Sequence, residues 1–285
     1  MTTLTVAPGR GTGAGPHPVA RIRQVLGDTV VLARRNLART LSEPESLIDV
    51  TLTPVVFTLL FAYVVGGAIA LPDGVSYHDY LIPGMFAMTM ASASTGTATA
   101  VNHDMANGII DRFRSLPMSR AGVLAGQSLA DLLTTVIAVV VLAATGLAIG
   151  WRIHTDAAHA VEGFALILLF AYALNWGMAC LGMVFRSAEG VQQFGVLMML
   201  GLTFVSSAFV PTEGMPAWLR EVANWNPLSA LSAAIRELFG NPNPASGVHA
   251  WPLQHPVLAT TVYSVAMIVL FAPLAVRLYR TRTAK

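Results

Sequence analysis

The segment VEGFALILLFAYALNWGMACLGMVF, from Val161 to Phe185, is almost entirely apolar, with Glu162 as its one charged residue. An α-helix needs about 20 apolar residues to cross the hydrocarbon core of a bilayer, and a transmembrane β-strand needs about half as many. Only helices and closed barrels satisfy every backbone hydrogen bond in lipid. Because the segment has helix length rather than strand length, it predicts a membrane-spanning α-helix.

Further apolar runs of similar length lie on either side of this segment. They are Leu47–Leu71, Tyr80–Val101, Ala121–Gly150, Val191–Val210 and Val257–Leu278. Over all 285 residues, 54% are hydrophobic and 11% are charged, whereas a soluble domain has about 25% charged residues. The sequence therefore predicts an all-α integral membrane protein, whose six transmembrane helices fill residues 46–285.

The basic residues are distributed unevenly between the predicted loops. If the N-terminus is inside, all but three of the 17 Lys and Arg residues lie on the inner side, the exceptions being Arg152, Arg220 and Arg236. Cytoplasmic loops of membrane proteins carry an excess of Lys and Arg. We therefore expect a multi-pass protein of the cell (plasma) membrane with both termini in the cytoplasm.

The residues before the first span form two parts. Residues 1–17 are rich in Gly, Pro and Thr and predict a disordered cytoplasmic tail. Residues 18–45 predict an interfacial elbow helix, because apolar side chains recur at helical spacing from Val19 to Leu37 and the arginines lie off that stripe. The helix is either a membrane anchor or an elbow that also contacts a cytoplasmic partner, through Arg34, Arg35 and Arg39.

A long segment, Pro211–Pro256, separates the last two spans. Its second half has the punctuation of a short helix, with Asn226 as N-cap, Pro227 in the first turn and Gly240 just past the end. About a dozen residues cannot cross the roughly 30 Å of hydrocarbon. We therefore expect this helix to dip into the membrane and return, or to lie at the outer surface.

Asp131 is the acidic residue that lies well inside an apolar run. An intramembrane carboxylate is by default a candidate for function, such as contact with a cation or a proton. Helical spacing places it on one face with Gln127, Thr134 and Thr135. The alternative is a structural role near the inner headgroups, paired with Arg120 or another arginine.

Other residues of a possible substrate path are Asn175, Met198 and Phe204. Asn175 could instead form a hydrogen bond to another helix, and the two apolar side chains could simply face lipid. The stretch Ala91–Ala100 consists entirely of small residues, and five of them carry a hydroxyl group. It predicts close helix packing or, alternatively, a polar wall of a translocation path.

The chemistry of an ATPase or a metalloenzyme is missing from the sequence. A Walker A loop needs a lysine for the nucleotide phosphates, and the only lysine is Lys285. No HExxH or GxSxG pattern occurs. We therefore expect no catalytic residue, no metal ligand and no cofactor on this chain, which is not an enzyme by itself.

A charged interlude, NGIIDRFRSLPMSR, joins the second and third runs between Asn107 and Arg120. We expect a short helix that ends at Pro117 and exposes Phe113 between two arginines, a composition typical of protein contacts. The alternative is a loop that only fixes the topology. The candidate contact residues are Asn107, Gly108, Ile109, Ile110, Asp111, Arg112, Phe113, Arg114, Ser115, Leu116 and Pro117.

This interlude resembles the signature of ABC-2-type transporter permeases, with Asp111 where glutamate is commoner. A second segment, FVSSAFVPTEGMPAWLR from Phe204 to Arg220, resembles the daunorubicin-resistance-like subgroup of drug and lipid exporters. Asn226-Pro227 and the stretch Ala234–Arg236 continue that match. The resemblance covers nearly the whole chain, and its two motifs are moderately specific together.

The resemblance implies six spans with an N-terminal elbow helix, a cytoplasmic coupling helix between spans 2 and 3, and re-entrant helices between spans 5 and 6. It also implies two copies of a separate cytoplasmic ATPase subunit, which binds ATP and Mg, and a second permease subunit in a homodimer or heterodimer. Residues Gly108–Pro117 would then dock into the ATPase. The substrate would be an amphiphilic drug or a lipid-like molecule, with membrane lipid around the protein and no nucleic acid partner.

Two other functions are compatible with the residues. The chain could be a passive channel or facilitator, or a membrane scaffold that signals through the cytoplasmic loop. Neither of these needs an ATPase partner, so copurification of such a subunit separates them from a transporter.

Overall fold

The computed structural model describes residues 44–66, 76–106, 120–185, 187–210, 212–243 and 247–282. All regular structure within these ranges is helical. The predicted elbow helix at residues 18–45 lies almost wholly outside them, and the predicted coupling segment Asn107–Pro117 lies outside them entirely. Predictions about those two segments therefore stay predictions.

Each predicted apolar run coincides with a helix of the structure. The long helices are α2 (Pro44–Leu60), continued by the π-helical turn η1 (Phe61–Val65), then α3 (Tyr77–Ala106), α5 (Arg120–Ala148), α6 (Ala157–Val184), α7 (Ala188–Phe204) and α11 (Pro256–Arg282). Between α7 and α11 lie the 3-10 turn η2 (Thr212–Gly214) and the short helices α8 (Ala217–Trp225), α9 (Pro227–Phe239) and α10 (Trp251–Gln254).

Three of the described helices are long and apolar enough to cross a membrane. The spanning windows are Asp131–Ala148, Ala157–Val184 and Pro256–Leu278. Helix α3 is longer, with 30 residues, but hydroxyl and small side chains fill much of its second half. Helix α7 has 17 residues and α2 has 17 before its π-helical turn. The fold is therefore that of an all-α membrane protein.

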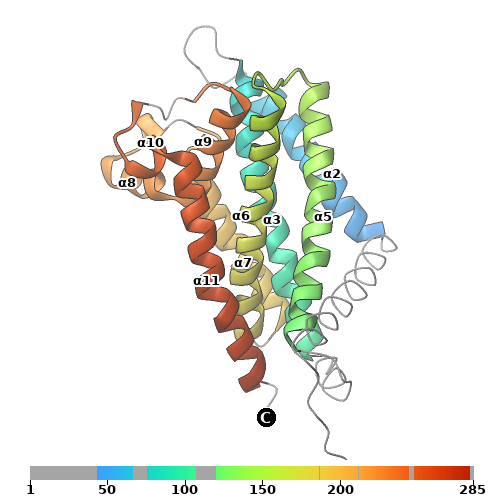
Figure 1. The fold of residues 1–285 in the computed structure, drawn as a ribbon. Coiled ribbons are helices and arrows are strands. Elements are labelled where there is room, and N and C mark those ends of the chain that lie inside the picture. The colour runs from blue at the N-terminus through green and yellow to red at the C-terminus, as the bar shows by residue number, and fades with distance from the viewer. Residues whose placement is uncertain are drawn as a thin grey trace, which may run out of the picture.

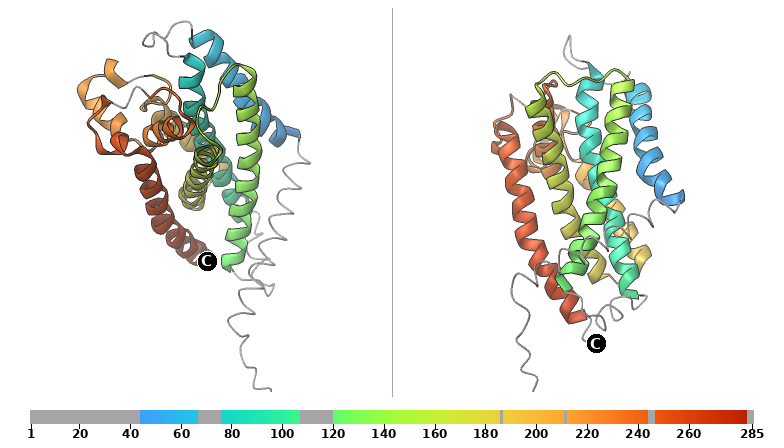
Figure 2. Two further views of the ribbon diagram at one scale, coloured as in Figure 1. Left: turned by 45° about the horizontal axis from the view of Figure 1, so that its top comes forward. Right: turned by 45° about the vertical axis from the view of Figure 1, so that its right-hand side comes forward.

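The long helices form one bundle, with α6 packed between α3 and α11 (Figure 1). The short helices α8, α9 and α10 gather at the end of the bundle where α5 joins α6, as all three views agree (Figure 2). The C-terminal end of α11 lies at the opposite end. We call these the short-helix end and the C-terminal end of the bundle.

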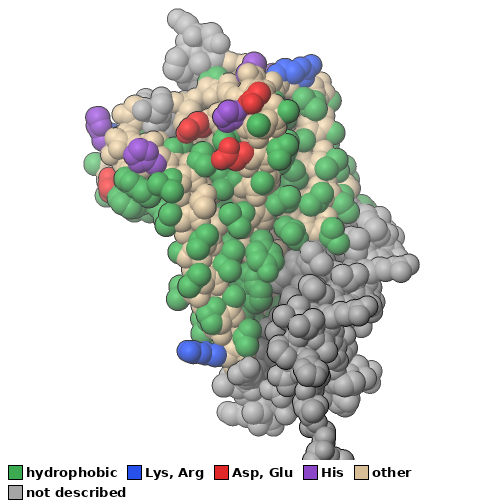
Figure 3. Space-filling model, viewed as in Figure 1, with side chains coloured by type: hydrophobic (Ala, Val, Ile, Leu, Met, Phe, Trp, Pro, Cys, Tyr) green, Lys and Arg blue, Asp and Glu red, His purple; other side chains and the backbone are tan. Residues whose placement is uncertain are grey.

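One face of the bundle is apolar along its length, and the charges lie near the ends. Figure 3 shows hydrophobic side chains along this face, acidic and His side chains toward the short-helix end, and basic side chains at both ends. Exposed apolar residues include Val140 on α5, Leu197 on α7 and Val269 on α11. Such faces suit a hydrocarbon environment, because a lipid solvent favours apolar side chains at the protein surface.

The core of the short-helix end is aromatic. Phe86 on α3 packs edge-to-face against Trp151 in the loop before α6, against Phe164 on α6 and against Phe239 on α9. The indole nitrogen of Trp151 donates a hydrogen bond of 2.9 Å to the side-chain oxygen of Asn241. This cluster joins α9 to the long helices, so the short helix is an integral part of the bundle.

The small-residue stretch Ala91–Ala100 of α3 has two faces in the structure. Ser94, Thr95 and Ala98 are buried, whereas Ser92 and Gly96 are exposed. On the buried face α6 approaches closely, because a Cβ atom at Gly182 would overlap the carbonyl oxygen of Ala98. The stretch therefore serves close packing on one side, as small residues in membrane helices do, and leaves a second, small-residue face exposed.

Candidate functional site

Asp131 is on helix α5, and its side chain accepts a hydrogen bond from helix α3. The hydroxyl of Thr97 on α3 donates to its carboxylate oxygen Oδ2 over 2.9 Å. The Asp131 side chain is half-buried, and its backbone carbonyl accepts a bond of 2.7 Å from the hydroxyl of Thr135. The side chain of Arg120, which we considered as a partner, is outside the described part of the protein.

Asn175 is buried on α6, near the middle of the bundle. Its amide nitrogen makes no hydrogen bond to a described residue, and neither does the buried hydroxyl of Thr95 on α3. A buried polar group without a partner is unfavourable and marks a place to look for function or for a further partner. The predicted hydrogen bond from Asn175 to another helix is therefore not formed by this nitrogen.

The two apolar candidates on α7 differ from each other. Met198 is half-buried and packs against the main hydrophobic core. Phe204 is exposed at the last turn of α7, with its ring 6.3 Å from that of Phe209. Together with Asp131 on α5 and Asn175 on α6 they come from three different helices.

At the C-terminal end of the bundle, Asn102 ties α3 to the turn between α6 and α7. Its amide nitrogen donates to the carbonyl oxygens of Gly182 and Phe185, each over 2.9 Å. These carbonyls belong to the end of α6, where the helix itself offers no donor. Asn102 lies in the last part of α3, and the predicted contact residues begin at Asn107, outside the described ranges together with Arg34, Arg35 and Arg39.

At the short-helix end, Asn226 confirms the predicted start of helix α9. Its side-chain oxygen accepts a bond of 2.8 Å from the backbone of Leu228, Pro227 follows in the first turn, and Gly240 ends the helix in the left-handed conformation. The same side chain donates to the carbonyl oxygen of Leu202 over 2.7 Å. The side-chain nitrogen of Asn226 also donates a hydrogen bond to the carbonyl oxygen of Val205. Asn226 therefore caps α9 and also fixes it to the last turn of α7.

Arg236 of α9, which the charge distribution assigns to the outer side with Arg152 and Arg220, is fully buried. Its guanidinium donates to three backbone carbonyls: Tyr80 (3.1 and 3.3 Å), Ser207 (both bonds 3.1 Å) and Ala208 (2.9 Å). The guanidinium carbon also lies 4.0 Å from the centre of the Tyr80 ring, in a cation–π contact. Sequence reasoning missed this site.

One signal in the sequence could have revealed it. Ser229, Ser232 and Arg236 recur at helical spacing and share a face, and all three are fully buried. Two small hydroxyl residues beside an arginine, on the face of a short helix that also has an apolar stripe, indicate a second buried face. The pattern does not say what the arginine would bind.

The turn after α7, Ser206–Ala208, is held by both α3 and α9. The backbone nitrogen of Ser207 donates to the hydroxyl of Ser229 over 2.9 Å, and the Tyr80 hydroxyl donates to the carbonyl of Ser207 over 2.9 Å. Gly84 of α3 lies against this turn, because a Cβ atom there would overlap the carbonyl oxygen of Ala208. We call Tyr80, Ser207, Ala208, Ser229 and Arg236 the carbonyl clamp.

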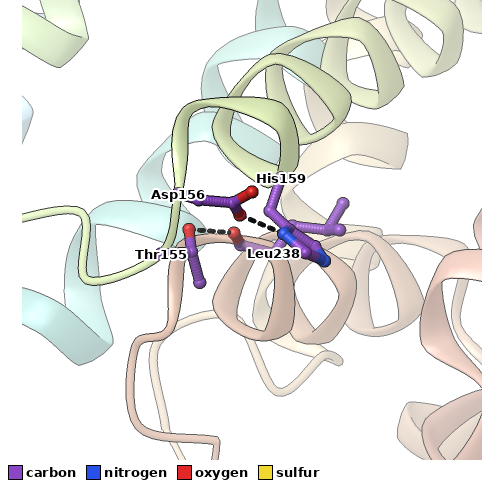
Figure 4. Close-up of polar contacts among 4 residues, drawn as sticks. All are labelled: Thr155, Asp156, His159 and Leu238. Carbon is purple, nitrogen blue, oxygen red and sulfur yellow. Dashed lines mark hydrogen bonds and ion pairs between the residues drawn. The ribbon is translucent and has the colours of Figure 1, made fainter.

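The start of α6 carries a charged pair on the surface of the same end, with Asp156 at the N-cap and His159 in the first turn (Figure 4). Asp156 and His159 are in contact through the carboxylate and a ring nitrogen, both exposed. The hydrogen bond from His159 lowers the pKa of Asp156. Next to them, the hydroxyl of Thr155 donates to the carbonyl of Leu238 over 2.6 Å, which fixes the loop before α6 to α9. The His and acidic side chains of the described ranges include no group of three that could hold a metal ion.

Comparison with known proteins gives consistent similarities over most of the chain. The family model described as ABC-2 type transporter matches residues 28–239. The daunorubicin resistance ABC transporter permease protein DrrB1 of Streptomyces coeruleorubidus is 32% identical over 241 residues, which are 85% of this chain and 82% of that protein. The doxorubicin resistance ABC transporter permease protein DrrB of Mycobacterium tuberculosis is 24% identical over 239 residues, 80% of this chain and 81% of that protein.

Proposed function

The chain belongs to the ABC-2 type transporter family, and we propose that it is the transmembrane permease subunit of an ATP-binding-cassette exporter. The observation that carries this proposal is the 32% identity to a daunorubicin resistance permease along 85% of the chain. The substrate is an amphiphilic drug or a lipid-like molecule. ATP and Mg bind to a separate cytoplasmic ATPase subunit, present in two copies, and a second permease subunit completes the transporter.

In this proposal the helices α2, α3, α5, α6, α7 and α11 are the six spans, with both termini in the cytoplasm. The distribution of charge supports this orientation, because the inner side then holds all but three of the 17 basic residues. The short-helix end faces outward, and α8, α9 and α10 lie at the outer interface or dip into it. The exposed Trp218 and Trp225 of α8 support an interfacial position.

The energy of ATP hydrolysis enters at Asn107–Pro117, with a contribution from Arg34, Arg35 and Arg39. The position of α3 supports this assignment, since the helix ends at Ala106, next to the segment. Asn102 joins the same part of α3 to the end of α6. A displacement of the coupling segment would therefore reach α6 as well as α3 through a single side chain.

For the substrate path we propose the four candidates on α5, α6 and α7, with Asp131 as the residue that responds to charge. The Thr97 hydroxyl occupies one carboxylate oxygen of Asp131, and the side chain is only half-buried. Asn175 adds a buried amide nitrogen that has no partner among the described residues. Met198 and Phe204 contribute adaptable apolar surface, which suits ligands of varied shape.

The test is transport by the complex purified with its ATPase subunit and reconstituted into vesicles. Uptake of a fluorescent amphiphilic cation into vesicles whose cytoplasmic face is outside should require ATP. The variants Asp111→Ala and Phe113→Ala should leave ATPase activity in place and reduce uptake by about tenfold, the effect of losing one buried interface contact. Asp156→Ala, at the opposite end of the bundle, is the matched control.

The outcomes separate the alternatives. Uptake that proceeds without ATP indicates a passive channel or facilitator, and a chain that copurifies with no ATPase indicates a scaffold. Unchanged ATP-driven uptake in both coupling variants would contradict the assignment of residues Asn107–Pro117 while leaving the exporter function intact.

A further inference from the structure

The carbonyl clamp encloses a cation without an acidic counterpart. Arg236 is fully buried, and it forms no ion pair with an acidic side chain of the described residues. A buried charge that has lost its water is strongly unfavourable unless hydrogen bonds replace the solvent. Here three backbone carbonyls and the face of the Tyr80 ring provide that replacement.

These acceptors come from two separate segments outside α9. Tyr80 belongs to the first turn of α3, and Ser207 and Ala208 belong to the turn that follows α7. Each of the three guanidinium nitrogens therefore has an acceptor only while α3, the end of α7 and α9 stay together. If α9 moved away, the cation and the carbonyl of Ala208 would both lose their partners.

Two further contacts support the same arrangement. The Tyr80 hydroxyl donates a hydrogen bond to the carbonyl of Ser207. The backbone nitrogen of Ser207 donates in turn to the hydroxyl of Ser229. Gly84 leaves just enough room for the Ala208 carbonyl beside α3. The turn is thus held through the backbone nitrogen of Ser207, through the carbonyls of Ser207 and Ala208, and by close contact with Gly84. These contacts are more than the end of a helix requires.

We propose that Arg236 is a positioning residue for transport, which latches α9 and the end of α7 to α3 and keeps the short-helix end of the bundle closed until the transport step separates them. The proposal rests on the proposed exporter function, because a substrate that leaves outward must pass this end. Arg236 does not touch the substrate. It sets how often the end opens.

Ser207 offers a reporter inside the latch. Its hydroxyl is buried and makes no hydrogen bond to a described residue, so Ser207→Cys replaces it without removing a described side-chain hydrogen bond. Cys180, the one cysteine of the chain, is replaced by Ser so that the new thiol is the only one. The rate at which a membrane-impermeant maleimide, added on the outer side, labels this thiol reports opening of the short-helix end.

The test variant is Arg236→Lys, which keeps the charge but loses the planar fork of donors that reaches several carbonyls at once. In membranes that contain the whole complex without ATP, it should raise the labelling rate by about tenfold, the effect expected from losing one hydrogen bond to a charged group. Uptake per ATP hydrolysed should fall, because opening no longer depends on the ATPase. Arg220→Lys on α8, an exposed arginine that bonds to the carbonyl of Met215, is the matched control.

Tyr80→Phe tests the latch with Arg236 in place. It removes the hydroxyl that bonds to Ser207 and keeps the ring beneath the guanidinium, so labelling should rise by about threefold, the effect of losing a neutral hydrogen bond. If Arg236→Lys does not fold, this variant decides the matter. Labelling at the rate of the Arg220→Lys control, in either folded variant, would overturn the proposal.

The labelling measurement needs neither ATP nor a substrate, so it does not depend on the proposed function. If the chain were not an exporter, ATP-driven uptake would already be absent in the parent protein. If only the latch were wrong, uptake would be normal and labelling would be the same in all variants. A purely packing role for Arg236 would lower the melting temperature without changing uptake per ATP, and that result would also count against the latch.

Discussion

Asp131 and Arg236 are both charged residues among apolar helices, and the protein surrounds them differently. Arg236 at the short-helix end is fully buried, and its donors are matched to the carbonyls of Tyr80, Ser207 and Ala208. Asp131 in the bundle is half-buried, and the side-chain bond described for its carboxylate comes from the Thr97 hydroxyl. The charge of Arg236 is fixed by backbone carbonyls from two segments. The charge of Asp131 accepts a hydrogen bond from a side-chain hydroxyl, which can rotate.

The difference shows what each region can do. A cation held by several carbonyls makes few adjustments, because every movement breaks several hydrogen bonds together. A half-buried carboxylate that accepts from a rotatable hydroxyl can exchange one hydrogen-bond partner for another, and it is a candidate for function. The short-helix end is therefore suited to hold a position, and the α3–α5 interface is suited to respond to what passes it.

The largest effect should come from Arg236→Met, which keeps most of the side-chain volume. The change leaves the buried carbonyl of Ala208 without its donor and should lower the free energy of unfolding by about 3 kcal/mol. Thermal and denaturant unfolding of the protein in detergent micelles would measure it. Arg220→Met, on the exposed face of α8, should stay within about 0.5 kcal/mol of the parent.

A loss below about 1 kcal/mol for Arg236→Met would remove the contrast between the two charges, since the carbonyl bonds would then contribute no more than a single neutral hydrogen bond. The cation would in that case be tolerated in its site without stabilising it. The latch would need another basis.

A smaller effect is expected at the α3–α5 interface. Thr97→Val removes the hydroxyl donor and should lower the free energy of unfolding by about 1 kcal/mol. Asp131→Asn keeps an oxygen acceptor for Thr97 and should change it by less than about 0.5 kcal/mol. The same Asp131→Asn variant should reduce uptake of an amphiphilic cation severalfold and leave uptake of a neutral analogue unchanged.

This pair of results sharpens the comparison, because stability and transport would respond to different changes. If Asp131→Asn destabilised the protein as strongly as Arg236→Met, then the carboxylate would be a structural charge like the arginine. Equal uptake of cationic and neutral compounds by the Asp131→Asn variant would argue against a role of the charge in the substrate path.

The sequence was sufficient for the helices whose cause is local. The apolar runs predicted each long helix, because lipid requires apolar segments of a fixed length. Asn226, Pro227 and Gly240 predicted α9, because caps act within one turn of the chain. The predicted six-span count and the roles of residues 18–45 and 107–117 stay predictions, since those segments lie mostly outside the described ranges.

The residues that the sequence did not predict act across long distances in the chain. Arg236 bonds to Tyr80, and Asn102 bonds to Gly182, contacts between residues far apart in sequence. Positive-inside counting assigns Arg236 to one side of the membrane, but it treats every arginine as a surface charge. Asp131 stood out because it interrupts an apolar run, whereas Arg236 lies in a short helix with other polar residues and gave no such contrast.

The smallest effect should come from the surface pair at the short-helix end. Asp156 and His159 are both exposed, and exposed pairs contribute little because water and salt screen them. The bond to His159 lowers the pKa of Asp156, so any stabilisation is present above the ordinary pKa of the carboxyl and is lost as the pH falls through the folded value. Asp156→Asn should therefore leave the melting temperature unchanged at pH 7 and at pH 3. A lower melting temperature of Asp156→Asn at pH 7 alone would show that the surface pair stabilises the fold at this end. The stabilisation assigned to the buried guanidinium of Arg236 would then have to be divided between Arg236 and the surface pair.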